Sequence, residues 1–114
     1  MTAQSDASLD DQAGNDEPRL WAAFKAQNSL AARAALFDRY AEFAYNIARR
    51  HYRERSRGDI DFSDLKQLAC AGLLEALDRF DPERGVPFRA FSSSRISGSV
   101  GCFIEKSSEV REQF

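Results

Sequence analysis

Hydrophobic residues recur at steps of three and four along most of this chain, which is the spacing of one face of an α-helix. The pattern runs through four segments: after Pro18, after Ser29, between Asp61 and Phe80, and from near Phe88 or Ala90 to Ile104. Nowhere do hydrophobic and polar residues alternate as they do along a half-buried β-strand. We therefore predict an all-α fold, a compact bundle of about four helices.

Residues that favour helix starts stand at the beginning of three of these segments. Pro18 suits a first helical turn, and Asn28 and Ser29 offer an N-cap for the second helix. Asp61 is the predicted N-cap of the third helix. The local chemistry thus agrees with the hydrophobic pattern.

A turn separates the third helix from the fourth. Asp81 ends the third helix because the residue before a proline, here Pro82, disfavours the α conformation. Gly85 supplies the turn. The fourth helix is intrinsically weak, since its serines and glycines are poor helix formers.

The third helix has two distinct faces when its residues are placed at 100° intervals. The broad apolar face is the predicted core face and comprises Leu65, Leu68, Ala69, Gly72, Leu73, Ala76, Leu77 and Phe80. The opposite side forms a stripe of Asp64, Gln67, Ala71, Leu74 and Asp78. Its apolar centre between two carboxylates indicates a docking surface, although an isolated exposed leucine is common.

The net charge of −2 hides an uneven distribution along the 114 residues. Residues 1–17 are small, polar and acidic, and we predict a disordered tail there. Without the first 18 residues, 16 basic residues face 13 acidic ones, so the body is mildly basic. We expect a helical domain over 18–106 and a C-terminal tail over 107–114.

A basic cluster stands at the end of the second helix: Arg49, Arg50, His51, Arg53, Arg55 and Arg57. Cations in a last helical turn complement the helix dipole, and a solvated helix end accounts for most of this cluster. His51 is a poor ligand candidate among arginines.

The chain holds no pattern typical of an enzyme or of an exported or membrane protein. It has no Gly-rich phosphate loop, no histidine paired with Ser92–Ser94, no metal-ligand spacing, and no run of about 18 apolar residues. Cys70 and Cys102 fit reduced thiols. We expect a cytoplasmic protein with no enzymatic activity, cofactor, metal or membrane association.

The stretch DFSDLKQLACAGLLEALDRFDPERGVPFRAFSSSRISGSV, residues 61–100, resembles region 2 of the sigma-70 family, the bacterial transcription initiation factors. The positions that match the family pattern are Asp64, Leu65, Gln67, Gly72, Leu73, Ala76, Phe80, Asp81, Gly85, Phe88, Phe91, Ile96 and Gly98. The residues from Leu20 to Tyr52 look like the family's preceding helices. The Phe-Asp-Pro sequence is closest to the flagellar and sporulation type.

The resemblance implies a partner for the stripe on the third helix. In the family this helix docks on the clamp helices, a coiled coil of the largest subunit of core RNA polymerase. Asp64, Gln67 and Leu74 fall on polymerase-contact positions, and Ala71 and Asp78 share their face. An apolar spot beside carboxylates suits a basic helical partner.

The resemblance also implies a DNA contact after the turn. In the family this segment binds the non-template strand of the minus-ten promoter element, with aromatics stacked on unpaired bases and one adenine flipped into a pocket. Phe91 stands where the family has a stacking tyrosine, and Phe88 is expected in the core beneath it. Arg89 and Arg95 are the candidate phosphate ligands, and either is equally a solvated surface charge.

Three departures from the family concern the DNA side more than the polymerase side. Ser97 replaces the second arginine of Arg-Ile-Arg-Gly, and the helix continues without a basic stretch. Leu68 and Cys70 replace commoner residues on the docking helix. The chain stops at Phe114, so we expect no minus-thirty-five domain.

Three functions stay open at this point. The first is a working initiation module that binds polymerase and the minus-ten strand, and that either needs a separate minus-thirty-five-binding polypeptide as a further partner or is a piece of a longer factor. The alternative is a regulator or decoy that binds polymerase, or a sigma partner such as an anti-sigma factor, without melting DNA. The third is a helical adapter with no role in transcription.

Overall fold

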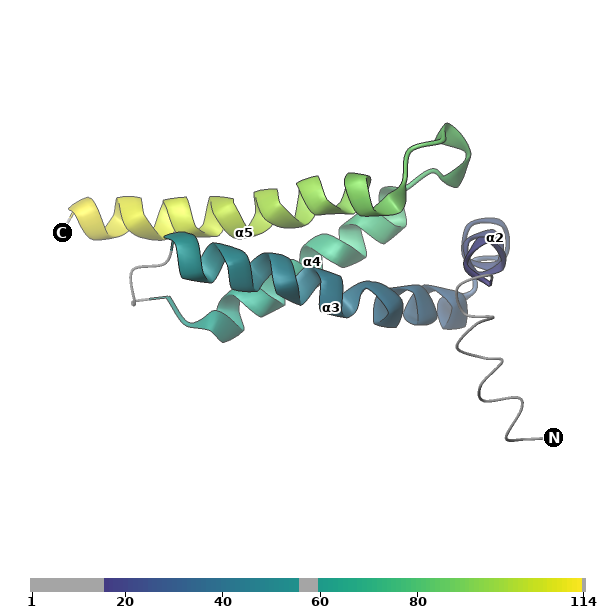
Figure 1. Cartoon of the computed structure of the whole chain (residues 1–114), viewed down its shortest axis with the longest axis horizontal. Coiled ribbons are helices and arrows are strands. Elements are labelled where there is room, and N and C mark those ends of the chain that lie inside the picture. Colours follow the sequence, from purple (N-terminus) through teal and green to yellow (C-terminus); the bar gives the residue numbers. More distant parts are fainter. Residues whose placement is uncertain (1–15, 56–59, 114) are drawn as a thin grey trace. The chain divides into compact units, whose positions relative to one another are not determined.

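The computed structural model describes residues 16–55 and 60–113. The α-helices in these residues are α2 (Glu17–Gln27), α3 (Leu30–Arg55), α4 (Phe62–Arg79) and α5 (Phe88–Gln113), and η1 (Pro82–Arg84) is a short 3-10 helix (Figure 1). The described part contains no strand, so the prediction of an all-α fold with four helices is confirmed. Most of the predicted acidic tail, residues 1–15, lies outside the described residues.

Most helices begin and end near the predicted residues, whereas α5 continues past its predicted end at Ile104. Pro18 lies in the first turn of α2, and Asn28 ends that helix in the left-handed conformation with a φ of 53°. The Ser29 hydroxyl accepts a hydrogen bond of 3.1 Å from the Ala32 amide, which is N-cap geometry for α3. Asn28 therefore caps α2, and Ser29 is the cap of α3.

The connections around α4 also follow the local chemistry. The Asp61 carboxylate accepts a hydrogen bond of 3.2 Å from the Ser63 amide at the start of α4. Phe80 has extended backbone at the other end. Gly85 follows η1 with a φ of 78°, a conformation that glycine adopts without strain. These caps fix where α4 stops and where the chain turns toward α5.

The chain divides into two units, residues 1–36 and 37–114, which are described separately. In the first unit, the indole Nε1 of Trp21 donates a hydrogen bond of 3.1 Å to Glu17, four residues earlier on α2. The rings of Trp21 and Phe24 are 6.3 Å apart, and the Lys25 ammonium lies 4.8 Å from the Phe24 ring centroid. These contacts order the aromatic face of α2.

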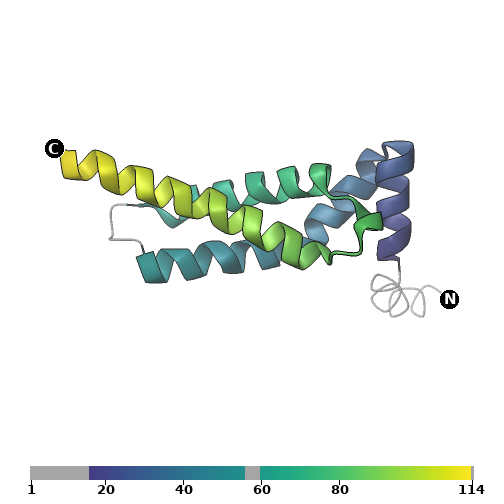
Figure 2. The same ribbon diagram turned by 90° about the horizontal axis from the view of Figure 1, so that it is seen from above.

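In the second unit, α3 and α5 run in the same direction and α4 runs in the opposite direction (Figures 1 and 2). Gly72 lets α4 approach α5 closely, since a Cβ atom there would stand 3.1 Å from the Cα of Ile96. The apolar face predicted for α4 is buried, with one correction: Leu68 is only half-buried. It lies at the margin of that face, where neighbouring helices cover it incompletely.

The start of α5 is held by aromatic packing. Phe88 is buried, as predicted, and its ring lies 4.7 Å from that of Tyr40 and 5.1 Å from that of Phe80. The helix then continues to Gln113, through most of the range 107–114 that we predicted as a tail. Glutamate, arginine and glutamine in this range are good helix formers. None of the helices in the described part combines the length and hydropathy needed to cross a bilayer.

Candidate functional site

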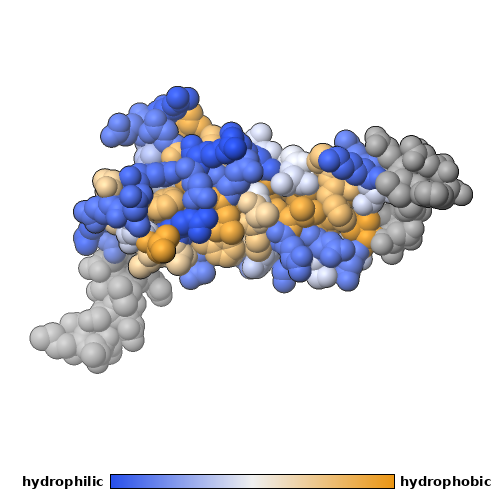
Figure 3. Space-filling model, turned by 180° about the vertical axis from the view of Figure 1, so that it is seen from behind, coloured by the Kyte–Doolittle hydropathy of each residue, from blue (hydrophilic) through white to orange (hydrophobic). Residues whose placement is uncertain are grey.

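The stripe predicted on α4 lies on the outer face of this helix. Asp64, Gln67, Ala71 and Asp78 are exposed, and Leu74 is half-buried. Figure 3 views the molecule from the side on which α4 lies, and hydrophobic side chains form a band there between hydrophilic ones. The helix phase deduced from the sequence is therefore correct for all five residues.

A hollow of about 480 Å³ opens on this face between α4 and α3. Its lining residues are Tyr45, Ser63, Lys66, Gln67, Cys70, Ala71 and Leu74. The hollow thus contains three of the five predicted docking residues, whereas Asp64 and Asp78 do not line it. The arrangement offers an apolar recess that a side chain of a partner helix can enter.

Tyr45 is the one α3 residue in this lining, and nothing in the hydrophobic pattern of the sequence pointed to it. The Cys70 sulfur lies 3.7 Å from the Tyr45 hydroxyl, and the Lys66 ammonium lies 4.8 Å from the ring centroid. The contact with Cys70, together with burial and the carboxylates of Glu42 and Asp38, raises the pKa of Tyr45. The hydroxyl therefore stays neutral at physiological pH, and α3 carboxylates add negative charge near the recess.

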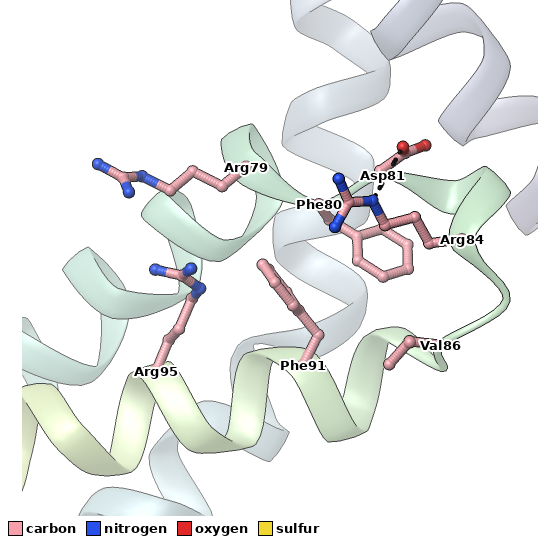
Figure 4. Close-up of a pocket in the computed structure, with 7 residues that line it drawn as sticks. All are labelled: Arg79, Phe80, Asp81, Arg84, Val86, Phe91 and Arg95. Atoms are coloured by element: carbon pink, nitrogen blue, oxygen red, sulfur yellow. Dashed lines mark ion pairs between the residues drawn. The ribbon is translucent and has the colours of Figure 1, made fainter.

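A second pocket, of about 300 Å³, lies where α4 meets the start of α5 (Figure 4). Its lining residues are Arg79, Phe80, Asp81, Arg84, Val86, Phe91 and Arg95. Figure 4 shows Phe91 and Arg95 reaching from α5 toward the end of α4, while Arg84 pairs with Asp81 at 3.6 Å. Three guanidinium groups around two phenyl rings make a pocket suited to a planar, anionic ligand.

Phe91, the predicted stacking residue, forms part of the wall of this pocket. It is half-buried, and its ring centroid lies 5.4 Å from that of Phe80. The guanidinium of Arg95 lies 4.7 Å from the same ring. One part of Phe91 is thus packed against the fold, and the rest faces the pocket.

The two predicted phosphate ligands lie in different surroundings. Arg95 donates a hydrogen bond of 3.1 Å to the Glu75 carboxylate on α4, so its charge is partly compensated within the fold. Arg89 does not line the pocket, and its guanidinium lies 4.9 Å from the ring centroid of Phe43. The structure brings Arg95 and Phe91 together and leaves Arg89 apart from them.

Arg79 and Arg84 also line the pocket, although neither was among the predicted DNA-binding residues. Both are exposed and lie on either side of the Asp81-Pro82 turn. The resemblance indicated a pocket for a flipped base without naming its walls. The sequence signal that could have identified Arg79 and Arg84 as pocket residues is their position within three residues of that turn.

Ser97, the departure from the family pattern, makes a contact between α5 and α3. Its hydroxyl lies 2.7 Å from Nε2 of His51, and Nδ1 of that ring is buried without a partner among the described residues. Burial, and then the charges of Arg55 and Arg50, lower the pKa of His51. The neutral ring therefore joins the two helices.

The comparison with protein families agrees with this geometry. Residues 36–107 match the family model described as Sigma-70 region 2. This range includes α4, the turn and the part of α5 that bears Phe91 and Arg95.

Two curated proteins illustrate the similarity. The RNA polymerase sigma-F factor of Kitasatospora aureofaciens is 44% identical over 48 residues, which are 42% of this chain and 16% of that protein. The RNA polymerase sigma factor FliA of Pseudomonas aeruginosa is 33% identical over 82 residues, 72% of this chain and 32% of that protein. The matches thus span a third or less of these relatives. With the family model matching well over half of its residues, the chain belongs to the sigma-70 family and carries region 2 of the flagellar and sporulation type.

Proposed function

We propose that this chain acts in transcription initiation, binding core RNA polymerase through the outer face of α4 and the minus-ten non-template strand through the start of α5. The observation that carries the proposal is the region 2 match over 36–107, which spans both surfaces. The two surfaces use different faces of the same helical unit.

The polymerase contact is assigned to the hollow and the stripe on α4. The partner we propose is the pair of clamp helices of the largest subunit. Leu74 and Ala71 supply apolar contact area, and Gln67 supplies a hydrogen-bonding group beside them. The nearby carboxylates of Asp64 and Asp78 favour a basic helix, because opposite charges steer association and select the partner.

The DNA contact is assigned to the pocket at the α4–α5 junction. Its volume of about 300 Å³ is at the lower end of small-ligand pockets, a size suited to a single unstacked base. Phe91 offers a ring for stacking. Arg79 and Arg84 are exposed and are held only by surface ion pairs, at 3.9 Å from Glu75 and 3.6 Å from Asp81, which can exchange for the neighbouring phosphates.

Two observations favour the alternative, a regulator or decoy that binds polymerase without melting DNA. Arg95 is engaged by Glu75, and the family's second arginine is replaced by Ser97. Because non-specific DNA affinity grows with the number of neutralised phosphates, α5 alone binds DNA weakly in either case.

The docking half is tested by Leu74→Arg in a pull-down with core RNA polymerase. We expect a loss of at least tenfold in affinity, since the guanidinium fills the apolar recess and opposes a basic partner. Ser94→Arg is the matched control, because Ser94 is exposed on α5. Equal retention of both variants would contradict the assignment of the α4 face.

A further inference from the structure

The end of α3 carries more arginines than the helix dipole accounts for. Residues 49–55 hold four arginines and one glutamate, Glu54. The dipole favours cations only within the last turn of a helix. It therefore accounts for Arg53 and Arg55 but not for Arg49 and Arg50, one turn earlier.

The four arginines differ in how much of their charge is compensated. Arg55 pairs with Glu105 at 3.1 Å, and Arg49 lies 3.9 Å from Glu42. Arg50 and Arg53 are exposed, and no carboxylate among the described residues forms an ion pair with either of them. Exposed pairs such as the first two are weak and exchange readily for another anion.

Contacts place this basic end beside the middle and distal part of α5. The side chains of His51 and Ser97 are in contact. The Arg55 guanidinium packs against Gly101, where a Cβ atom would come within 2.9 Å of it, so the glycine leaves room for this arginine. Burial, and after it the charges of Arg55 and Arg50, lower the pKa of His51 at this contact. The arginine end of α3 and the surface of α5 are therefore continuous.

The adjoining part of α5 has little positive charge of its own. Beyond Arg95 its sequence holds two cations and three carboxylates. Phe91 and Gly101 are ten residues apart, about 15 Å along the helix, which corresponds to four or five base pairs of duplex. DNA that extended from a base held at Phe91 along α5 for this length would come to the end of α3.

We propose that the arginine end of α3 binds the phosphates of the double-stranded DNA that flanks the single-stranded minus-ten element, chiefly through Arg50 and Arg53, which form no ion pair within the described residues. This inference rests on the proposed function and deepens it: α3 supplies phosphate contacts that α5 lacks. The partner we propose is the flanking duplex, since exposed guanidinium groups bind phosphates and this end adjoins the helix that bears Phe91.

The test measures binding of labelled oligonucleotides by the full chain in complex with core polymerase, with core polymerase alone subtracted. Three probes are used: the single-stranded minus-ten element, and the same strand with a 5′ or a 3′ duplex arm. The double variant Arg50→Ala/Arg53→Ala is compared with a control double variant, Arg19→Ala/Arg39→Ala. The control removes the same amount of charge from exposed positions elsewhere. Arg50→Lys with Arg53→Lys keeps the charge.

We expect one of the duplex arms to strengthen binding in the unaltered protein. The Arg50/Arg53 alanine variant should lose that gain, and its slope of log affinity against log salt should fall by about two. The lysine variant and the Arg19/Arg39 control should keep both. Absence of a gain with either arm, a gain unaffected by the Arg50/Arg53 variant, or an equal loss in the control would overturn the inference.

The same experiment separates this inference from the proposed function. The single-stranded probe reports on the pocket at Phe91, and the duplex arm reports on the end of α3. Single-strand binding without an arginine-dependent gain rejects only the α3 surface. A gain from the arm without sequence-dependent single-strand binding rejects only the minus-ten assignment.

Discussion

The outer faces of α4 and α5 come from one continuous family motif, yet they use their residues differently. On α4, the five predicted docking residues face outward and three of them line an open hollow. On α5, Arg95 binds Glu75 and Ser97 contacts His51. A motif identifies which positions are available for a function, but only packing decides whether a side chain is engaged within the fold.

The largest effect is expected on the core side of α4, where two neighbouring leucines differ. Leu73 is fully buried, so Leu73→Ala should lower the free energy of unfolding by about 2–5 kcal/mol. Leu74→Ala should lower it by much less, because that side chain is half-buried at the hollow. Urea titrations compare the two variants. Similar losses would mean that the two faces of α4 are not distinct.

The second prediction concerns the engaged aromatic of α5. Phe91→Ala should weaken binding of the minus-ten strand by about 1–3 kcal/mol, the usual contribution of one stacked base. Phe91→Leu preserves most of the packing against Phe80 and removes the aromatic ring, so its affinity should also fall while its melting temperature changes little. If Phe91→Leu binds as the unaltered protein does, Phe91 has only a structural role.

The third prediction compares two glycines, one at the contact between α4 and α5 and one on the open surface of α5. At Gly72 an added methyl group meets the backbone of Ile96 at 3.1 Å, so Gly72→Ala should destabilise the fold by about 1–3 kcal/mol. At Gly98 no atom lies within 4 Å of the added group, and Gly98→Ala should stabilise the helix by up to about 1 kcal/mol. Thermal melts that move in the same direction would contradict this close approach.

The smallest effect concerns the contact between His51 and Ser97. The folded-state pKa of His51 is lowered, so the unfolded chain takes up this proton near its ordinary pKa of about 6.5 while the folded chain does not. The contribution of neutral His51 to the free energy of unfolding is therefore fully present above about pH 6.5, and it decreases as the pH falls below this value. His51→Gln should lose less stability than the unaltered protein between pH 7.5 and 5.5. Parallel profiles of unfolding free energy against pH for the two proteins would show that His51 makes no such contribution.

Features set by local chemistry were predictable from the sequence. Asp61, Pro82 and Gly85 act within a few residues of themselves, so helix ends could be assigned correctly. The faces of α4 followed from the helical repeat, apart from Leu68 at their margin. The continuation of α5 to Gln113 was missed, because the hydrophobic positions that mark its helical pattern end at Ile104.

Features that depend on distant segments were not predictable in this way. The contact between His51 and Ser97 joins residues 46 positions apart, and no periodic pattern relates them. Tyr45 enters the α4 hollow from another helix, and Arg95 pairs with a carboxylate 20 residues away. The sequence therefore indicated which surfaces face outward, while the partners of individual charged groups required the folded structure.

The most direct test of the account is fluorescence anisotropy of a labelled minus-ten non-template oligonucleotide. It is measured with this protein alone, with core RNA polymerase alone, and with both together. The account predicts sequence-dependent binding only when both are present, because α4 docks on polymerase and the Phe91 pocket then meets the strand. Polymerase binding with no added DNA signal would contradict it and leave a regulator or decoy as the function.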